Sequence, residues 1–471
     1  MSEYDVVIIG AGAVAENVAD RVVQGGLTAV LIERELVGGE CSYWACMPSK
    51  ALIRSGIALR AAQRVAGARE AATGSVDVAA VLARRNSFTH DWDDSSQVEW
   101  VHGAGIDLVR GHGRITGERE VTVSADDGTM TTLRARHAVV VSTGSDPLLP
   151  DIPGLRESSP WTPRDATSAQ VAPSSLAIIG GGVVGVEMAT AYASFGTTVT
   201  LFARSGLLAG QEEFAGDAVA AGLRDLGVDI RRESPDRVER SEDGIAIYAG
   251  SDIVIAEHVL VATGRTPRTT DIGVEVAGLK PGDWIDVDDT LRAVASDWLY
   301  ATGDVNHRAL LTHQGKYQAR AAGDVIVARA TGARVDDAPW GAHVASADHR
   351  AVPQVTFSEP EVASVGLTAS AARAQGFDVR TIDYEIGNVA GASLQADGYS
   401  GHARLVVDEK RHVIIGATFV GQDVAELIHA ATIAVVGEVA LDRLWHAVPA
   451  YPTMNEVWLR LLEAYGRPAP E

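Results

Sequence analysis

The stretch Val6-Val7-Ile8-Ile9-Gly10-Ala11-Gly12-Ala13-Val14-Ala15 decides the fold of the first part of the chain. Its β-branched residues predict a short buried strand, and the glycines that follow predict a tight turn into a helix. An apolar-periodic segment over 14–23 and a second strand over 27–32 complete a strand–turn–helix–strand unit. In this context Gly10 permits the turn, and Gly12 lets the backbone approach a pyrophosphate at the helix N-terminus. The stretch therefore predicts a Rossmann-like dinucleotide-binding fold.

Two further positions complete this fingerprint. Ala15 stands where the third glycine would lie, a variant that still permits close packing of helix and strand. Glu33 ends the second strand, and its carboxylate would accept hydrogen bonds from the hydroxyls of the adenosine ribose. A lone glycine pattern is a weak signal, but this one recurs at Gly180-Gly181-Gly182-Val183-Val184-Gly185, again between a short apolar strand and a helix. Two such folds imply two dinucleotides, typically one bound flavin and one exchangeable nicotinamide.

The second copy differs from the first at the end of its second strand. Gly180, Gly182 and Gly185 keep the glycine spacing. The acidic residue that would hold a free ribose 2′-hydroxyl is replaced by Ala203, and Arg204 follows it. Loss of the carboxylate removes a repulsion, and a guanidinium can pair with a 2′-phosphate. We therefore expect the nicotinamide cosubstrate to be NADPH in preference to NADH.

The two cysteines of the chain, Cys41 and Cys46, lie between the first fold and the following helix. In a straight α-helix, residues five apart have Cα atoms separated by about 8.7 Å, from the pitch and radius of the helix. A disulfide needs roughly 4.4–6.8 Å, so a bonded pair requires a distorted helix start. Gly38, Gly39 and Pro48 suit such an irregular start. A strained disulfide is easily reduced, which favours a working redox pair over a structural staple.

The composition is that of an ordinary globular protein, with 46% hydrophobic and 22% charged residues in a chain of 471. This length predicts roughly two to four domains. The formal net charge of −22 argues against nucleic acid or an anionic membrane as a partner. No apolar run is long enough to span a bilayer, and the acidic start of the chain is unlike a signal peptide, so we expect a cytoplasmic location. Two cysteines and no His-Glu-x-x-His run predict no metal site.

The segment Gly39-x-Cys41-x4-Cys46-x-Pro48-x-Lys50 resembles the active-site signature of the pyridine nucleotide–disulfide oxidoreductases. This family includes lipoamide dehydrogenase, glutathione reductase and mercuric reductase. The resemblance covers nearly the whole chain, through further motifs whose order and spacing match the family: Ser142–Ser145, Ala262–Arg265, Ala301–Asp304, Leu310–His313 and Pro353–Gly366.

The resemblance implies an α/β fold with two Rossmann-like dinucleotide-binding domains, for FAD and NAD(P), and a C-terminal α+β dimerisation domain. From the order of the motifs we expect the FAD domain to be split over residues 1–145 and 266–340. The NAD(P) domain, over 146–265, would be inserted between them, and the dimerisation domain would span 341–471. A homodimer is expected, because in this family a C-terminal loop reaches the cysteines of the partner subunit.

The resemblance also gives roles to single residues. Cys46 would be the thiolate against the flavin, and Cys41 the outer thiol that meets the substrate. Lys50 would lie near the flavin N5 with Glu187 as its ion-pair partner, which lets a buried lysine stay charged and stabilise reduced flavin. The expected cofactor contacts are Gly10, Gly12, Ala15, Glu33, Arg34, Gly39, Glu40, Cys41, Lys50, His112, Gly113, Thr143, Gly144, Ser145, Gly180, Gly182, Gly185, Glu187, Ala203, Arg204, Val238, Gly264, Arg265, Asp304, Leu310, Leu311, Thr312 and His313.

Near the C-terminus the chain departs from the disulfide-reducing members, which carry a His-Pro-Thr-x-x-Glu pattern. The matching stretch places Tyr451 at the histidine position and retains Glu456, and both are kept as candidate catalytic residues. A tyrosine with a reference pKa of about 10 is a poor general base at neutral pH, whereas a histidine at about 6.5 is well placed. His446 lies nearby and could substitute, although a structural role is favoured for it.

Mercuric reductases resemble this chain in carrying a tyrosine there, and Leu201–Ser205 is similar to their NADPH-binding strand. They also carry a C-terminal cysteine pair, whereas no cysteine follows Cys46. We expect an FAD-dependent oxidoreductase that passes electrons from NAD(P)H through flavin to a Cys41–Cys46 disulfide and on to a small-molecule acceptor. The alternatives are a mercuric, metal-ion or quinone reductase, a dihydrolipoamide dehydrogenase-like enzyme, and a non-catalytic flavin-binding redox sensor.

Overall fold

The computed structural model describes residues 2–467, so that Met1 and 468–471, at the outer ends of the first and last predicted domains, lie outside the described residues. The chain forms two compact units that are interleaved in sequence. The first unit consists of Met1–Pro48, Arg85–Leu148 and Gly264–Asp348, and the second of Ser49–Arg84, Leu149–Thr263 and His349–Glu471. The boundaries between the predicted FAD, NAD(P) and dimerisation segments stay a prediction.

A seven-stranded sheet forms the centre of the first unit, in the order β3-β2-β1-β6-β5-β4, with β16 paired to β6. Strands β3, β2, β1, β6 and β16 are parallel, and β5 and β4 continue the sheet antiparallel. The strands are β1 (Ser2–Ile9), β2 (Ala29–Glu33), β3 (Asp107–Arg110), β4 (His112–Gly117), β5 (Glu120–Ser124), β6 (Met130–Val141) and β16 (Leu299–Ala301). Residues Val6–Ile9 are buried because both faces of β1 are covered: Val6 and Ile8 belong to one core, and Val7 and Ile9 to the other.

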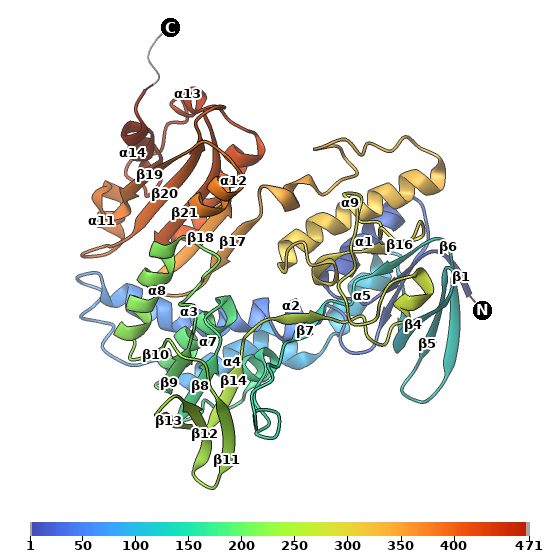
Figure 1. Ribbon diagram of the computed structural model, residues 1–471, viewed down its shortest axis with the longest axis horizontal. Coiled ribbons are helices and arrows are strands. Elements are labelled where there is room, and N and C mark those ends of the chain that lie inside the picture. Colours follow the sequence, from blue (N-terminus) through green and yellow to red (C-terminus); the bar gives the residue numbers. More distant parts are fainter. Residues whose placement is uncertain (1, 468–471) are drawn as a thin grey trace. The chain divides into compact units, whose positions relative to one another are not determined.

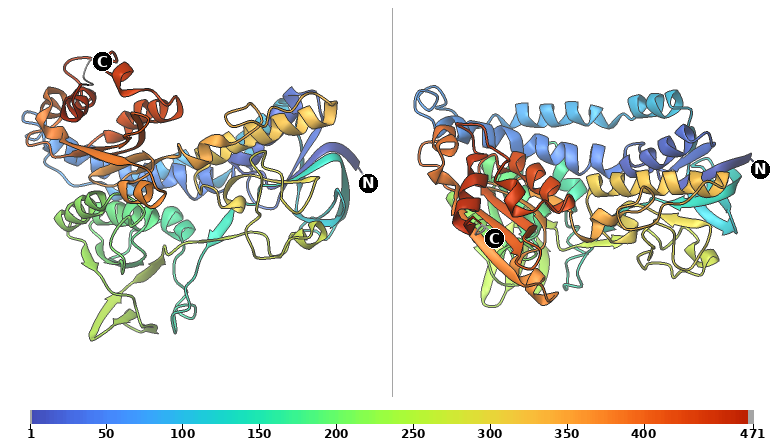
Figure 2. Two further views of the ribbon diagram at one scale, coloured as in Figure 1. Left: turned by 45° about the horizontal axis from the view of Figure 1, so that its top comes forward. Right: turned by 90° about the horizontal axis from the view of Figure 1, so that it is seen from above.

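Helices α1 (Ala13–Gln24) and α9 (Thr312–Thr331) pack together on one face of this sheet (Figures 1 and 2). Val18 and Val22 of α1 share a core with Ala319 and Ile326 of α9, and all four are at most 2% exposed. The opposite face carries a second core, built around strands β4 to β6 and the segment that precedes β16. A short ribbon of β7 (Ser145–Pro147) and β15 (Arg265–Pro267) and the helix α5 (Ser95–Gly103) complete the unit.

Two helices belong to both units. Helix α3 (Cys46–Gln63) begins in the first unit and continues in the second. Helix α4 (Val78–Phe88) begins in the second unit and ends in the first. Helix α3 follows the short α2 (Gly39–Tyr43), and its buried side chains Leu52, Ile53 and Ile57 share a core with Ala191 of the second unit.

A second parallel sheet, in the order β10-β9-β8-β14, carries the repeated glycine fingerprint. Helix α7, which follows the fingerprint, is buried along most of its length, and a small antiparallel sheet, β11-β12-β13, packs beside β8 and β14. The elements are α6 (Pro163–Ser168), β8 (Ser175–Ile179), α7 (Val183–Ser194), β9 (Thr198–Phe202), α8 (Glu213–Asp225), β10 (Asp229–Arg231), β11 (Arg237–Ser241), β12 (Gly244–Ala249), β13 (Asp252–Ala256) and β14 (His258–Val261).

The C-terminal part of the second unit is an antiparallel five-stranded sheet, in the order β17-β18-β21-β20-β19, with helices on it (Figure 1). The predicted fold class, two Rossmann-like folds followed by an α+β domain, is confirmed. The elements are β17 (Pro353–Thr356), β18 (Glu361–Gly366), α10 (Ala369–Ala374), β19 (Val379–Glu385), α11 (Ala390–Gln395), β20 (His402–Asp408), β21 (Val413–Gly421), α12 (Ile428–Val436), α13 (Leu441–Leu444) and α14 (Glu456–Tyr465).

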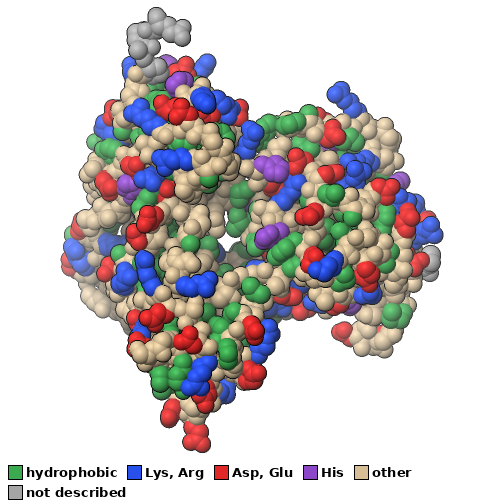
Figure 3. Space-filling model, in the orientation of Figure 1, with side chains coloured by type: hydrophobic (Ala, Val, Ile, Leu, Met, Phe, Trp, Pro, Cys, Tyr) green, Lys and Arg blue, Asp and Glu red, His purple; other side chains and the backbone are tan. Residues whose placement is uncertain are grey.

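Charged side chains of both signs are interspersed on the face of the molecule in Figure 3, and apolar side chains lie between them. Over residues 2–467, no helix combines the length and the apolar character needed to cross a membrane.

Candidate active site

Cys41 and Cys46 lie on different helices. Helix α2 ends at Tyr43, α3 begins at Cys46, and Trp44 between them is non-helical, with φ −135° and ψ −6°. The N–H of Ala45 donates to the carbonyl of Glu40 at 2.6 Å, a wider turn than that of an α-helix. The irregular helix start that the spacing predicts is therefore present. Both cysteines are thiols in the structure, and the disulfide stays a prediction.

Thr312, the first residue of α9, lies against the cysteine pair. Its Oγ1 is 3.2 Å from Sγ of Cys46. A hydrogen bond to Cys46 and burial raise the pKa of the Cys41 thiol, and Thr312 and Lys316 offset part of this rise. Cys41 consequently holds its proton more firmly than an ordinary cysteine.

The first glycine fingerprint and the cysteine segment are in direct contact. The N–H of Gly38 donates to the carbonyl of Ala11 at 2.8 Å. A Cβ placed on Gly39, whose φ is +58°, would lie only 2.9 Å from Cα of Gly12, so this contact requires glycine. Glu33 accepts from the N–H of Ala11 at 2.7 Å, which fixes its carboxylate beside the turn. The structure thus brings the predicted residues of the first fingerprint to one end of α1.

A second group of predicted flavin contacts lies at the end of β6. Oγ of Ser145 donates to Asp304 at 2.6 Å and accepts from Nε of Arg265 at 2.6 Å. Arg265 was expected to close the nicotinamide domain, yet it lies in the first unit beside these residues. Thr143 donates to the carbonyl of Arg268 at 2.8 Å.

Arg268 is a site residue that the sequence did not single out. It donates to Glu40, just before Cys41, at 3.0 Å and to Asp146 at 2.6 Å. It thereby ties the cysteine segment to the segment after β6. No local pattern indicates this bridge, because Arg268 and Glu40 are 228 positions apart.

The other predicted contacts of the first unit are less closely grouped. Arg34 and His112 both approach the Asp271 carboxylate, at 4.0 and 3.6 Å. Gly113 lies on β4, Leu310 and Leu311 precede α9, and His313, in its first turn, is exposed.

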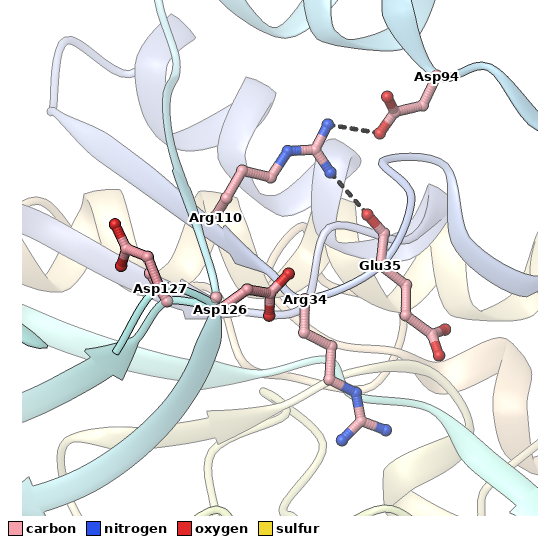
Figure 4. Close-up of a pocket in the computed structure, with 8 residues that line it drawn as sticks. Arg34, Glu35, Asp94, Arg110, Asp126 and Asp127 are labelled. Atoms are coloured by element: carbon pink, nitrogen blue, oxygen red, sulfur yellow. Dashed lines mark hydrogen bonds and ion pairs between the residues drawn. The ribbon is translucent and has the colours of Figure 1, made fainter. Parts of the chain in front are cut away.

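A pocket of about 410 Å³ lies beyond β2 (Figure 4). Arg110 there donates to Asp94 at 2.5 Å and to the carbonyl of Glu35 at 2.8 Å. The Asp94 carboxylate balances the charge of the Arg110 guanidinium. The lining residues are Arg34, Glu35, Asp94, Arg110, Gly111, Ala125, Asp126 and Asp127.

These residues fit a bound dinucleotide such as FAD. Gly12, the N-cap of α1, is open, since a Cβ there would meet nothing closer than 4.0 Å, and a Cβ on Gly144 would meet nothing within 4 Å. The first turn of α1 leaves main-chain N–H groups for a pyrophosphate. Glu33 and Asp304 offer carboxylate oxygens to sugar or ribityl hydroxyls.

In the second unit, Lys50 and Glu187 form the expected ion pair. Nζ of Lys50 donates to Oε2 of Glu187 at 2.8 Å, and the other carboxylate oxygen accepts from the N–H of Phe357 at 3.1 Å. Glu187 is 3% exposed. Nζ of Lys50 also lies 5.0 Å from the centroid of the Phe357 ring.

The second fingerprint has the predicted form. Gly180 and Gly182 link β8 to α7, and nothing lies within 4 Å of a Cβ on Gly182. Ala203 follows β9, is 3% exposed and donates its N–H to the carbonyl of Arg231 at 2.8 Å. Arg204 is exposed at this edge of the sheet.

The remaining nicotinamide predictions fall on buried or boundary positions. Gly185, in the first turn of α7, is buried, and a Cβ there would strike the carbonyl of Gly180, which explains the need for glycine. Val238 is 3% exposed and belongs to a core with Phe202, while Gly264 opens the last segment of the first unit.

The candidate residues near the C-terminus are divided between surface and interior. Tyr451 is 78% exposed and precedes a cis peptide bond to Pro452. Glu456, the first residue of α14, is 7% exposed and accepts from the N–H of Gly391 at 3.1 Å. Within the described part of the chain no hydrogen bond joins the two. His446 is exposed.

Comparison with known proteins gives matches along almost the entire chain. Residues 4–332 match the family described as pyridine nucleotide-disulphide oxidoreductase, and residues 352–461 match the dimerisation domain of that family. Mercuric reductase of Staphylococcus aureus is 30% identical over 462 residues, which cover 96% of this chain and 81% of that protein.

Dihydrolipoyl dehydrogenase of Halobacterium salinarum is 29% identical over 484 residues, which cover 98% of this chain and 95% of that protein. Among solved structures, the Cu(II) complex of the HOCl-induced flavoprotein disulfide reductase RclA of Escherichia coli has a TM-score of 0.84 and 24% identity. This match covers 98% of the present chain and 99% of RclA, and it shows a common fold.

Proposed function

The chain belongs to the pyridine nucleotide-disulphide oxidoreductase family, whose cofactors are FAD and NAD(P)H, and we propose that it carries electrons from NAD(P)H to a small-molecule acceptor by way of FAD and Cys41–Cys46. One observation carries this proposal. The break between α2 and α3 places the two cysteines next to Thr312, in the unit that holds the first glycine fingerprint.

The first unit supplies the residues that would hold FAD. The N-terminus of α1 would bind the pyrophosphate, Glu33 the adenosine ribose, and Asp304 the ribityl chain. Ser145 and Arg265 orient the Asp304 carboxylate through the hydrogen bonds at Ser145 Oγ. When bound, FAD supplies the two-electron chemistry between the nicotinamide and the cysteines.

The two cysteines have different tasks in this proposal. Cys46, which accepts from Cys41 and contacts Thr312, is the sulfur that faces the cofactor. Cys41, the protonated thiol, is the sulfur that meets the acceptor. Lys50, paired with Glu187 at 2.8 Å, would contribute a positive charge that favours the reduced cofactor.

We propose NADPH as the favoured cosubstrate. The buried Ala203 leaves no carboxylate at the end of β9 to repel a 2′-phosphate, and the exposed Arg204 follows it. A guanidinium can bind a phosphate through two parallel hydrogen bonds, which a ribose hydroxyl cannot match.

A reductase of metal ions or quinones is the second candidate function. The observation that favours it is Tyr451 at the position where disulfide-reducing members carry histidine. Disulfide exchange needs a proton acceptor for the outer thiol, whereas electron transfer to a metal ion or quinone does not. The match to the dimerisation domain supports a homodimer in either case.

A turnover screen tests the proposal. The purified protein is offered NADPH and NADH with small disulfides, Hg(II), Cu(II) and quinones, and the screen is repeated with C41S. We expect flavin reduction by NADPH and a long-wavelength thiolate–flavin absorbance band on partial reduction. C41S should abolish transfer to acceptors that react at the thiol and should retain direct transfer from flavin to quinone.

Two results would contradict the proposal. A protein that binds FAD but is not reduced by either nicotinamide is a flavin-binding module and not a reductase. Equal turnover of every acceptor by the parent protein and C41S would remove the cysteines from the electron path.

A further inference from the structure

Arg232, the residue directly after β10, is an exposed cation to which the proposed function gives no task. The guanidinium of its neighbour Arg231 is already paired, because Nε donates to Asp229 at 2.8 Å and Nη1 to Asp252 at 2.7 Å. In the part of the chain that the structure describes, no carboxylate forms an ion pair with Arg232, and none does so with Arg204. An unpaired arginine is common on a protein surface, so the position of Arg232 has to decide whether it has a ligand.

The position of Arg232 follows from the pairing of β10 with β9. The two strands are parallel, with Arg231 level with Phe202, and the N–H of Ala203 donates to the carbonyl of Arg231 at 2.8 Å. Arg232 therefore begins beside Ala203 at the carboxyl edge of the sheet, where neighbouring strands lie about 4.8 Å apart. Arg204 starts from the same edge. The two unpaired arginines thus come from adjacent strand ends.

Successive side chains of a strand point to opposite faces of its sheet. Arg231 points to the face that carries β13, because its partner Asp252 is the first residue of β13. Arg232 comes next and so leaves the end of β10 on the other face. Ala203 points to that face as well, toward α7 and α8, and its Cβ would lie only 2.8 Å from a Cβ placed on Gly181. Arg232 and Ala203 are therefore both directed to the side of the second fingerprint.

The loop that carries Arg204 is held against this fingerprint. The N–H of Leu208 donates to the carbonyl of Gly181 at 2.8 Å, and the N–H of Gly206 donates to the carbonyl of Ala203 at 2.9 Å. A Cβ on Gly181 would lie 2.6 Å from the carbonyl oxygen of Gly206, so the loop closes on a residue that must lack a side chain. Arg204 consequently starts from a fixed turn next to the place where a dinucleotide would bind.

We propose that Arg232 binds the 2′-phosphate of NADPH together with Arg204. The inference rests on the proposed preference for NADPH and deepens it, because it assigns the phosphate to two cations from two strands. Two unpaired positive charges at neighbouring strand ends repel each other. A phosphate between them removes this repulsion and accepts charge-assisted hydrogen bonds from both guanidinium groups.

A solvated surface charge without a ligand is the simpler role for Arg232. The acidic residues of the neighbouring segments are Glu233, which follows it, and Glu213 and Asp217 on α8. All three are exposed, and within residues 2–467 none of them forms an ion pair with Arg232. The guanidinium is therefore available to a ligand. A solvated charge predicts that loss of Arg232 has the same small effect on nucleotides with and without a 2′-phosphate.

Binding of adenosine nucleotides to the FAD-loaded protein tests the proposal without catalysis. The probes are 2′,5′-ADP, which carries the 2′-phosphate, and 5′-AMP, which lacks it. Titration calorimetry measures both affinities at low ionic strength, because salt screens exposed charges. We expect the parent protein to bind 2′,5′-ADP more tightly than 5′-AMP. R232Q should weaken binding of 2′,5′-ADP about 10- to 100-fold, as loss of a charge-assisted hydrogen bond implies, and should change binding of 5′-AMP by less than about twofold.

Two further variants separate contact with the phosphate from a change of net charge. R224Q makes the same charge change in the last turn of α8, which leads to the amino end of β10 at the opposite edge of the sheet, and it should bind both probes like the parent. R232K keeps the charge but loses the planar fork of the guanidinium. Its affinity for 2′,5′-ADP should lie between those of the parent and R232Q.

The proposal is overturned if R232Q binds 2′,5′-ADP as tightly as R224Q does, or if R232Q weakens both probes equally. A parent protein that binds the two probes equally overturns it as well, together with the preference for NADPH. Failure of the proposed function is a separate result, recognised as a flavin that NADPH does not reduce, whatever the affinity for 2′,5′-ADP.

Discussion

Glu187 is a buried carboxylate with partners from two distant segments. It binds Nζ of Lys50 from α3 and the N–H of Phe357 from the turn after β17. The side chain of Lys50 is 36% exposed, so the attraction between the two charges is partly screened by water. The hydrogen bond to Phe357 is sheltered, and its loss leaves a main-chain donor without its acceptor.

We expect E187A to lower the thermal unfolding midpoint by about 2–5 °C, because it leaves both partners unpaired at a cost of roughly 1–3 kcal/mol. E187Q keeps an oxygen that accepts from the Phe357 N–H, so its unfolding midpoint should fall by less than half as much as that of E187A. E463A, which breaks an exposed pair with Arg460 at 2.7 Å, should change the midpoint by at most about 1–2 °C. Thermal melts followed by flavin fluorescence measure all three, and equal losses in E187A and E463A would contradict the argument.

At the level of one side chain, we propose that Arg204 sets the preference for NADPH over NADH. A charged hydrogen-bond donor to phosphate contributes roughly 1.5–3 kcal/mol, so R204Q should lower kcat/KM for NADPH about 10- to 100-fold. The value for NADH should change by less than about twofold, since NADH has no phosphate there. R237Q is the control, because Arg237 lies on β11, away from the end of β9, and pairs there with Glu239 at 2.9 Å. A parent protein with equal kcat/KM for the two nicotinamides would show the preference to be wrong.

The sequence predicts residues whose role is local and fails for those whose partners lie far away. Gly12, Glu33 and the cysteines belong to short patterns with fixed spacing, so the sequence alone is enough to propose them. Glu16 sits in one of these patterns, but Lys316, whose charge offsets part of the rise in its pKa on burial, lies far along the chain on α9. No spacing within the first forty residues contains that information.

At the level of elements, the break between α2 and α3 is the feature that makes the cysteine pair possible. Just before this break, the start of α2 lies close to the start of α1, since a Cβ on Gly39 would come within 2.9 Å of Cα of Gly12. A methyl group at Gly39 must push the two helices apart, and it must also adopt a φ of +58°.

We expect G39A to weaken FAD binding about 10- to 100-fold, as a cost of roughly 1.5–3 kcal/mol implies. Gly26 provides a matched control, since its φ is +82° but nothing lies within 4 Å of a Cβ there. G26A introduces only the strain of a positive φ at alanine. The difference in FAD affinity between G39A and G26A therefore measures the effect of the contact between Gly39 and Gly12. Titration of the apoprotein with FAD measures both, and identical affinities would contradict the role given to the helix contact.

The ends of the strands are determined by pairing with neighbouring strands as well as by the local sequence pattern. The apolar run predicts a strand over 6–9, but β1 extends over Ser2–Ile9 because Ser2, Glu3 and Tyr4 pair with β6. The second strand is expected over 27–32 and lies at Ala29–Glu33. In both cases hydrogen bonds to a neighbouring strand set the end of the element, and a polar residue at the edge gives no sign of them.

For the molecule as a whole, the return of the chain to its first unit could be predicted, because the Asp304 motif is recognisable. That α3 and α4 each belong to both units could not be predicted, because the composition of neither helix changes at the boundary between the units. The match of residues 352–461 to the dimerisation domain of the family supports a further level of assembly. Val448, close to Tyr451 in the chain, lies in this segment and is 85% exposed.

We expect the protein to sediment as a homodimer and V448D to shift it towards monomer, because a carboxylate would be buried against the partner. I253D is the control, since Ile253 is 57% exposed on β13 and should leave the dimer intact. Analytical ultracentrifugation distinguishes the two states. A parent protein that is monomeric at micromolar concentration would show the expected assembly to be wrong.

The pairing of β16 with β6 also has a consequence for how the protein is made on the ribosome. Strand β6 leaves the ribosome long before β16 and α9, because the whole of Leu149–Thr263 is translated between them. At about 5–20 residues per second this interval is on the order of ten seconds, during which the apolar face of α1 has no α9 to cover it. The first fingerprint is therefore translated early but completed late, and the nascent chain depends on chaperones or on its own collapse until its second half arrives.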